Sequence, residues 1–142
     1  MSSTDAAVRA LLASRAEAAR VKDIDRLMAH YAPEVVYYDA VPPLRFAGTE
    51  EVRRNFLRWF DGYDGPIGLE THELTVAVGG DVAFAHMLHL DSGKRANGVE
   101  SSIWVRSTVG CRRVNGTWLI THEHISLPID METLQAWFAP VD

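Results

Sequence analysis

The sequence has a single cysteine, no excess of basic residues and no long apolar run. Its 142 residues carry 14 Lys and Arg against 19 Asp and Glu, a formal net charge of −5. Cys111 has no second cysteine to pair with, which excludes an internal disulfide. No apolar run approaches the roughly 20 residues that cross a bilayer, and no secretory signal precedes a cleavage site. We therefore expect a cytoplasmic protein that binds neither nucleic acid nor membrane.

Motifs for phosphate binding and for nucleophilic catalysis are also missing. The chain contains no Walker loop, dinucleotide fingerprint, nucleophile elbow or paired-cysteine motif. The sequence therefore supports neither a phosphate-bearing cofactor nor a serine-triad hydrolase. We expect a protein that works without a cofactor and without a bound metal.

The composition is that of an ordinary globular domain. Apolar residues make up 47% of the chain and charged residues 23%, a balance that forms a sizeable core without crosslinks. No repeat, linker or low-complexity segment interrupts the sequence. We expect one domain over 1–142.

Hydrophobic periodicity predicts helices at the start of the chain and strands after them. The expected elements are helices over 5–20, 24–31 and 48–60 around a strand over 34–39, then strands over 69–78, 82–90, 99–114 and 117–127, and a short C-terminal helix over 130–138. Asn115-Gly116 between the last two strands is a preferred hairpin turn, because both central residues need positive φ.

The order αα-β-α-ββββ predicts an α+β fold. Helices gathered at one end of the chain must cover one face of the sheet. Long twisted hairpins beside three helices predict a curved antiparallel sheet that wraps around the N-terminal helices as a half-open cone. The mouth of such a cone is a natural pocket.

Four segments resemble one known family. They are Asp23–Glu34 (DIDRLMAHYAPE), Val36–Asp39 (VYYD), Phe46–Arg53 (FAGTEEVR) and Gly116–Ser126 (GTWLITHEHIS). In their order and spacing they resemble the nuclear-transport-factor-2-like superfamily, in its SnoaL-like branch related to ketosteroid isomerase. The resemblance implies a cystatin-like fold and a homodimer that pairs across the open sheet face. It leaves the activity open, because this fold hosts isomerases, cyclases, dehydratases, hydrolases and pure binding modules.

Asp39 is the first candidate for chemistry. It ends a strand and precedes a Pro-Pro loop, so it lies near the expected pocket mouth. A carboxylate that is partly desolvated there is a candidate general base with a raised pKa. By resemblance, Asp39 stands where the base of ketosteroid isomerase would stand, while Arg15 or a neighbour occupies the position of that enzyme's helix tyrosine. The alternative is a solvated aspartate that accepts hydrogen bonds from turn amides.

The final strand supplies two further candidates. His122, His124 and Ser126 share one face by the two-residue period of a strand, with Trp118 and Ile120 before them. Facing a pocket, His122 could polarise a carbonyl or relay a proton, and His124 could contact the ligand. Alternatively, both are hydrogen-bonded in the core or in a dimer interface. Glu123 alternates to the other face, which predicts an interface or solvent position for it.

The expected pocket wall includes residues from four other segments. Arg106 could bind a developing oxyanion, with Trp104 as a flat apolar wall beside it, or both could lie in an interface. His86 could face the same cavity or be structural. The remaining ligand-binding candidates are Arg15, within the apolar stripe of the first helix, Tyr38, Phe56 and Trp59.

Three functions remain open from the sequence. The first is a cofactor-free isomerase, cyclase or dehydratase that acts on a small, apolar or aromatic carbonyl compound, with Asp39 as base and Arg106 or His122 stabilising the oxygen. The second is a non-catalytic ligand-binding or oligomerisation module. The third is a metal-dependent enzyme in which His122, His124 and either Asp39 or His86 hold the ion.

Overall fold

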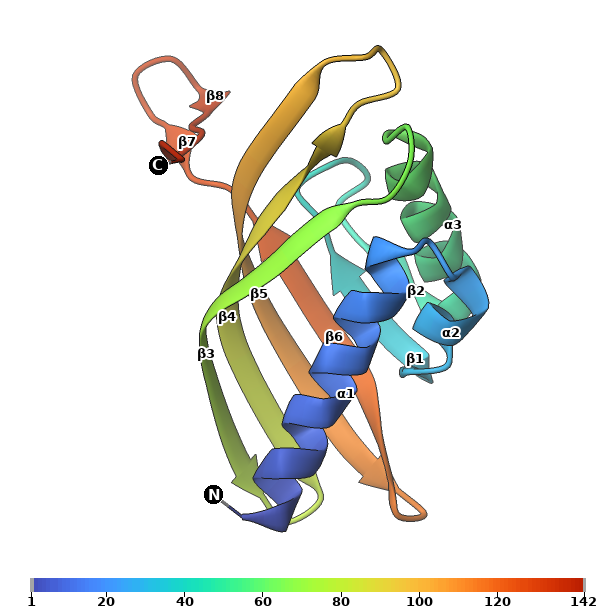
Figure 1. The fold of residues 1–142 in the computed structure, drawn as a ribbon. Coiled ribbons are helices and arrows are strands. Elements are labelled where there is room, and N and C mark those ends of the chain that lie inside the picture. The colour runs from blue at the N-terminus through green and yellow to red at the C-terminus, as the bar shows by residue number, and fades with distance from the viewer. Residues whose placement is uncertain (1, 142) are drawn as a thin grey trace.

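The computed structural model describes residues 2–141, so the two terminal residues of the expected domain lie outside the described residues. The elements, in chain order, are α1 (Ser3–Arg20), α2 (Ile24–Met28), β1 (Tyr31–Tyr38), β2 (Phe46–Ala47), α3 (Gly48–Asp61), β3 (Gly68–Gly79), β4 (Val82–Lys94), β5 (Glu100–Val114), β6 (Thr117–Ser126), β7 (Ile129–Asp130) and β8 (Gln135–Ala136). A curved sheet wraps around the helices, which confirms the predicted α+β cone (Figure 1).

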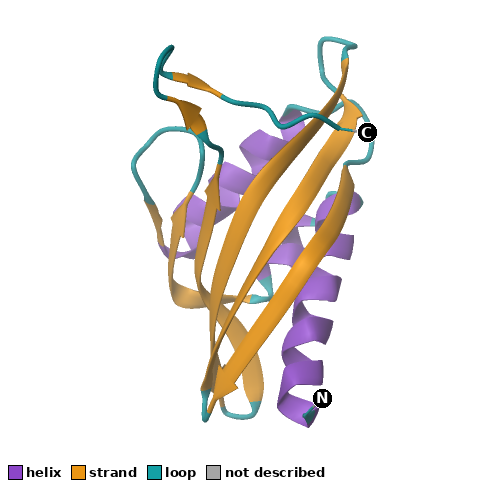
Figure 2. Cartoon of the chain, turned by 90° about the vertical axis from the view of Figure 1, so that its left-hand side faces the viewer, coloured by secondary structure: helices purple, strands orange, loops and turns teal. Residues whose placement is uncertain are grey.

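The main sheet has six strands in the order β2-β1-β6-β5-β4-β3. Its hairpins are antiparallel, but β1 pairs with β6 in parallel. The expectation of a wholly antiparallel sheet is therefore wrong at this pair. A parallel pair needs a long crossover, and here α3, β3, β4 and β5 lie between the two strands in the chain. The sheet is open, and Figure 2 looks onto its outer side with the helices behind it.

Helix α1 covers the inner face of the sheet. It begins where the periodicity predicts, because the Ser2 hydroxyl accepts a hydrogen bond from the Asp5 amide at 3.0 Å. Its apolar stripe, which includes Val8 and Leu12, is buried in the core. Arg15 lies within this stripe and is only 5% exposed, so the helix carries one charge into the interior.

Strand β1 begins at Tyr31, three residues before the predicted strand. Pro33 lies within it and is exposed. Proline donates no ladder hydrogen bond, and the register with β6 is interrupted between Tyr31 and Val36. The proline therefore interrupts the pairing of β1 with β6, and the preceding helix α2 ends earlier, at Met28.

Strand β6 contains a bulge that reverses its alternation. Cys111 of β5 pairs with Ile120, and the next residue back, Gly110, pairs with His122. Thr121 is the extra residue between them, and its hydroxyl donates to the Gly110 carbonyl at 3.3 Å. An extra residue moves every later side chain of the strand to the opposite face. This bulge decides which residues of β6 reach the interior.

The predicted C-terminal helix is wrong, because the segment forms the two-stranded hairpin β7–β8. Asp130 accepts a hydrogen bond from the Glu132 amide through its side chain, and its carbonyl accepts one from the Leu134 amide at 2.7 Å. Leu134 has φ of 60°, which no helix allows. A helix this short also has little stability without a packed face.

No helix within residues 2–141 combines the length and the apolar character that crossing a membrane requires.

Candidate functional site

The helices and the inner face of the sheet enclose a cavity of about 220 Å³. Aromatic side chains of α3, Phe56 and Trp59, form one wall. Branched apolar side chains of β5 and β6, among them Ile103, Val105 and Ile125, form another wall. Most of the lining is therefore apolar, and the polar groups that reach the cavity are few and well placed. This is the usual character of a small-molecule site.

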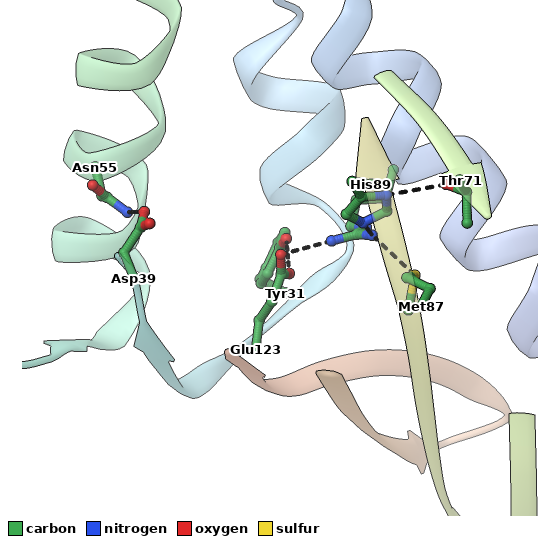
Figure 3. A network of polar contacts seen from close by, with 8 residues as sticks. Tyr31, Asp39, Asn55, Thr71, Met87, His89 and Glu123 are labelled. Carbon is green, nitrogen blue, oxygen red and sulfur yellow. Dashed lines mark hydrogen bonds and ion pairs between the residues drawn. The ribbon is translucent and has the colours of Figure 1, made fainter. Parts of the chain in front are cut away.

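The floor of the cavity is a buried ion pair. Nη1 of Arg15 donates to Oε2 of Glu123 at 2.7 Å, and the Tyr31 hydroxyl donates to Oε1 of the same carboxylate at 2.6 Å. Figure 3 shows the side chains of Tyr31 and Glu123 meeting at this point. Burial raises the pKa of Tyr31 well above its usual value, and the Glu123 carboxylate raises it further. The phenol therefore stays protonated and acts as a donor.

His89 extends this network to β4. Nη2 of Arg15 lies 3.2 Å from Nε2 of His89, and the Nδ1 atom lies 3.2 Å from the Thr71 hydroxyl. Because a guanidinium can only donate, Nε2 must accept and Nδ1 carries the proton. Burial, followed by the Arg15 charge, lowers the pKa of His89 to about 3. His89 is therefore a neutral imidazole that helps to orient Arg15.

Asp39 directly follows the last residue of β1 and lines the cavity. Its Oδ2 accepts a hydrogen bond from Nδ2 of Asn55 in α3 at 2.8 Å (Figure 3), and Nη2 of Arg58 lies 3.6 Å from the same oxygen. Its Oδ1 accepts from the Ala40 amide. The side chain is 15% exposed. Asn55 is itself buried, so α3 fixes the direction of a carboxylate that lines the cavity.

Asp91 is a second carboxyl group in the cavity lining, on β4. Its Oδ1 is buried and has no hydrogen-bond partner among residues 2–141. Burial raises the pKa of Asp91 to about 7, against the opposing effect of Arg15 and with a smaller contribution from the charge of Asp39. A carboxyl group of this kind is substantially protonated near neutral pH, and it can donate a hydrogen bond or a proton.

Four of the residues predicted for the site lie in this cavity. They are Asp39, Arg15, Phe56 and Trp59. Tyr38 is 40% exposed and points to the outer side of the sheet, where its ring lies 4.8 Å from that of His122. Its neighbour Tyr37 lines the cavity instead, because side chains alternate along β1.

The predicted orientation of the histidine pair is wrong. The bulge at Thr121 turns His122 and His124 to the outer side, where Nδ1 of His122 lies 2.7 Å from the Val36 carbonyl oxygen. The same reversal brings Glu123 inward, where it is 2% exposed. The expectation that Glu123 lies in solvent or an interface is wrong for the same reason.

Trp104, Arg106 and His86 also lie on the outer side, contrary to the prediction for the pocket wall. Trp104 and Arg106 line a separate outer groove, and His86 pairs with Thr108 on the exposed face. Large apolar residues occur on both faces of β4 and β5. The alternation of apolar residues alone therefore does not show which face is the inner one. His122 and His124 lie on the other side of the sheet from Asp39, so these three residues do not come together. For the set with His86, no group of three or more His, Cys, Asp or Glu side chains within residues 2–141 is arranged to hold a metal ion.

Sequence reasoning missed the residues that make most of the polar site. They are Tyr31, His89, Asp91 and Glu123. One signal was present for two of them: His89 and Asp91 continue the two-residue period of Ala83, Ala85 and Met87. The predicted strand ended at residue 90 and therefore left Asp91 out.

Comparison with known proteins identifies the family. The model of the SnoaL-like domain matches residues 8–130. The chain belongs to the SnoaL-like family. No curated protein gives a significant match to this SnoaL-like chain.

Solved structures share the fold. An NTF2-like protein of unknown function from Pseudomonas putida KT2440 is 33% identical over 98% of this chain and 96% of that chain, with a TM-score of 0.88. A ketosteroid isomerase-like protein from Erwinia carotovora atroseptica is 20% identical over 89% of this chain and 97% of that chain, with a TM-score of 0.75. A cystatin-like protein from Nostoc punctiforme is 15% identical over 90% and 94%, with a TM-score of 0.74.

Proposed function

We propose that this SnoaL-like protein binds a compact, largely apolar carbonyl compound in the inner cavity and catalyses proton transfer on it without a cofactor. One observation carries the proposal: two carboxyl groups, Asp39 and Asp91, line the same apolar cavity in different surroundings. Asn55 and Arg58 contact Oδ2 of Asp39, whereas Oδ1 of Asp91 is buried without a partner among residues 2–141, and burial raises the pKa of Asp91 to about 7. Two carboxyl groups with unlike surroundings in one cavity are typical of acid–base catalysis. A cytoplasmic location, expected from the sequence, is part of the same proposal.

Asp39 is the proposed general base. Nδ2 of Asn55 donates to its Oδ2, and Nη2 of Arg58 lies 3.6 Å from the same oxygen, so the carboxyl group is held in one orientation. A base must be oriented toward the proton that it abstracts, and its orienting partners usually come from a rigid element. Here that element is α3. The carboxylate would take a proton from the carbon next to the carbonyl group.

Asp91 is the proposed partner on the ligand's oxygen. As carbon loses its proton to Asp39, negative charge develops on the carbonyl oxygen, and a protonated carboxyl can donate to it. The enol or enolate then regains a proton at carbon, either at the same position or at another. Return of the proton from Asp39 leaves both carboxyl groups as they began, so the cycle needs no oxidant or metal.

The cavity supports a small ligand. A volume of about 220 Å³ lies below the range of about 300–1,000 Å³ that is common for drug-sized ligands. We therefore propose a one-ring or two-ring molecule that packs against Phe56 and Trp59, with Arg15 as part of the polar floor. In this proposal Asp91 stabilises the ligand's oxygen, the role that the sequence predicted for Arg106 or His122.

Proton exchange on a model ketone tests this function without knowledge of the natural substrate. The carbon-bound protons of 2-tetralone next to the carbonyl exchange with D2O, and 1H NMR follows their loss. We expect the protein to accelerate the exchange, Asp39→Asn to reduce it to the background rate and Asp91→Asn to reduce it in part. Asp25→Asn, an exposed control in α2, should retain the full rate. Saturable binding of 2-tetralone without any acceleration would exclude catalysis on this compound and favour a binding module.

A second observation favours a homodimer, as the oligomerisation alternative also requires. The outer side of the sheet exposes apolar side chains that solvent does not favour, including Phe84 at 52% and Val82 at 54%. Contiguous exposed apolar patches mark interaction sites. We propose that two copies pair through this outer face, with the histidines His86, His122 and His124 in or beside the interface. Light scattering after size-exclusion chromatography measures the mass, and Phe84→Glu should shift it from two chains to one.

A further inference from the structure

The hairpin β7–β8 and its flanking residues form a C-terminal arm, residues 128–138, that projects beyond the edge of the main sheet (Figures 1 and 2). Its shape is fixed by its own hydrogen bonds. The Leu134 amide donates to the Asp130 carbonyl at 2.7 Å, and the Trp137 amide donates to the Pro128 carbonyl at 2.8 Å. The arm is therefore preorganised for a contact.

The arm exposes an unusual amount of apolar surface. Its large apolar side chains are all exposed, namely Ile129 at 59%, Met131 at 78%, Leu134 at 73%, Trp137 at 48% and Phe138 at 57%. Single exposed apolar residues are normal on a protein surface, but a cluster of this size marks an interaction site. A two-stranded hairpin is also marginal by itself in water. Burial against a partner would supply the missing stability.

A complementary groove lies on the outer side of the same chain. It has a volume of about 530 Å³, and Leu88, Trp104 and Arg106 line it. Pro128, the first residue of the arm, also lines the groove, as do Ala139 and Pro140, which directly follow the arm. The arm thus leaves from the edge of the groove while its own apolar tip stays exposed. A second copy placed against the outer face would bring another arm to this groove.

Charge favours the same partner. The arm carries Asp130 and Glu132, and residues 127–142 contain no Lys or Arg. Arg106 is exposed at the groove, where its Nε donates to the Ser126 hydroxyl at 3.0 Å. No carboxylate oxygen within residues 2–141 lies within 4.0 Å of the Arg106 guanidinium. The groove is lined by Arg106 and also by Glu73. Arg106 is the cation available to the carboxylates of the arm, and every copy of the chain has both the arm and the groove.

We propose that the C-terminal arm of one copy docks in the outer-face groove of a second copy, with its apolar side chains in the groove and its carboxylates near Arg106. The exchange is reciprocal in a two-fold dimer. This inference rests on the homodimer proposed above and adds the segment that holds it. Trp137 and Phe138 are half-exposed, so docking would cover on the order of 100 Å² of each. A standard interface takes about 800 Å² from each partner, so the arm would form one part of the contact and the Phe84 region another.

Photocrosslinking between labelled copies tests the contact directly. The photoreactive residue p-benzoylphenylalanine replaces Leu134 at the exposed tip, and equal amounts of 15N-labelled and unlabelled protein are mixed before irradiation. Mass spectrometry then separates crosslinks between copies from those within one copy. We expect mixed-isotope crosslinks from the arm to residues of β4 or β5 that line the groove. Crosslinks only within single copies, or none to the groove, would overturn the proposal.

Charge and apolar variants give an independent measurement. We expect Leu134→Glu to weaken dimerisation at least tenfold, as measured by analytical ultracentrifugation. Val21→Glu, at an apolar site after α1 that is 62% exposed against 73% for Leu134, should leave it unchanged. Glu132→Arg and Arg106→Glu should each weaken the dimer, and their combination should restore part of the loss. A wild-type monomer would overturn both the dimer and the arm contact. A dimer that Leu134→Glu leaves intact, with no crosslink between copies, would overturn the arm contact alone.

Discussion

Nη1 of Arg15 lies 2.7 Å from Oε2 of Glu123, and the two side chains are 7% and 2% exposed. The residues are separated by 108 positions in the chain, so the pair joins the first helix to the last long strand. Two charges this deeply buried are stable only while each has the other. The pair therefore holds the floor of the cavity in one arrangement at a cost in desolvation.

Removing one partner of this pair should strongly destabilise the protein. We expect Arg15→Met to lower the free energy of unfolding by about 3–5 kcal/mol, because it leaves the Glu123 carboxylate buried without its cation. Urea unfolding followed by tryptophan fluorescence measures this loss. Arg53→Met removes the exposed pair with Asp25 and should cost less than about 1 kcal/mol. Equal losses in the two variants would contradict the buried role.

The sequence predicts the helices and long strands well because their signals are local. The Ser2 cap, the apolar stripe of α1 and the Asn115-Gly116 turn depend only on near neighbours. The turn forms as expected, with positive φ at both residues. The C-terminal segment was predicted wrongly because Met131, Leu134 and Phe138 have helical spacing, while the hydrogen bonds of Asp130 set a turn. The parallel pairing of β1 with β6 depends on contacts that no short window contains.

The site was less predictable than the fold, for two physical reasons. A single extra residue, Thr121, reverses the face of everything after it in β6, and no local pattern announces the bulge. The outer side of the sheet is also apolar, so residues such as Phe84 and Trp104 resemble core positions. Asp39 was found because it follows a strand and precedes a loop. Asp91 lies inside a strand and gives no such signal.

Asp91 should make the protein less stable as the pH rises. Its pKa in the folded state is about 7 and in the unfolded chain about 3.9. Between these values the folded state holds a proton that the unfolded state has lost, so unfolding becomes easier as pH rises from about 4 to about 7. The full effect is on the order of 4 kcal/mol. Asp91→Asn should remove this slope, as measured by urea unfolding at several pH values.

Asp64→Asn is the control for that measurement, because Asp64 is exposed and forms a surface pair with Lys94. Its stability profile should follow the wild type. An Asp91→Asn profile that also follows the wild type between about pH 4 and about pH 7 would show that Asp91 ionises normally. That result would contradict the proposal that Asp91 is protonated near neutral pH and donates to the ligand.

His89 should have the opposite dependence on pH. Burial and the Arg15 charge hold its folded pKa at about 3, below the value of 6.5 expected when unfolded. The unfolded state therefore gains a proton first as the pH falls, and the stability that depends on neutral His89 is lost from about pH 6.5 down to about pH 3. In the wild type this loss offsets the gain from Asp91. We expect His89→Gln to lower stability near neutral pH and to become more stable, relative to wild type, as the medium is acidified.

Nuclear magnetic resonance separates this explanation from a general packing defect. The ring carbon protons of His89 should not shift between about pH 8 and about pH 5, because its pKa is lowered to about 3. A midpoint for His89 near the ordinary histidine value would contradict its role as a neutral acceptor for Arg15.

A larger side chain in the cavity should weaken ligand binding while it leaves the stability of the fold nearly unchanged. Val105 is 8% exposed and lines the cavity, so the larger ring of Val105→Phe has empty space to enter. Overpacking of a filled core costs about 1–3 kcal/mol, and we expect this variant to lose less than that because the space is open. Its affinity for 2-tetralone should fall at least tenfold, as measured by titration of tryptophan fluorescence. Val78→Phe, on an exposed part of β3, should bind the ketone like the wild type. Val105 also lines the outer-face groove, so a Val105→Phe variant with unchanged affinity would count against ketone binding in the cavity and in that groove alike.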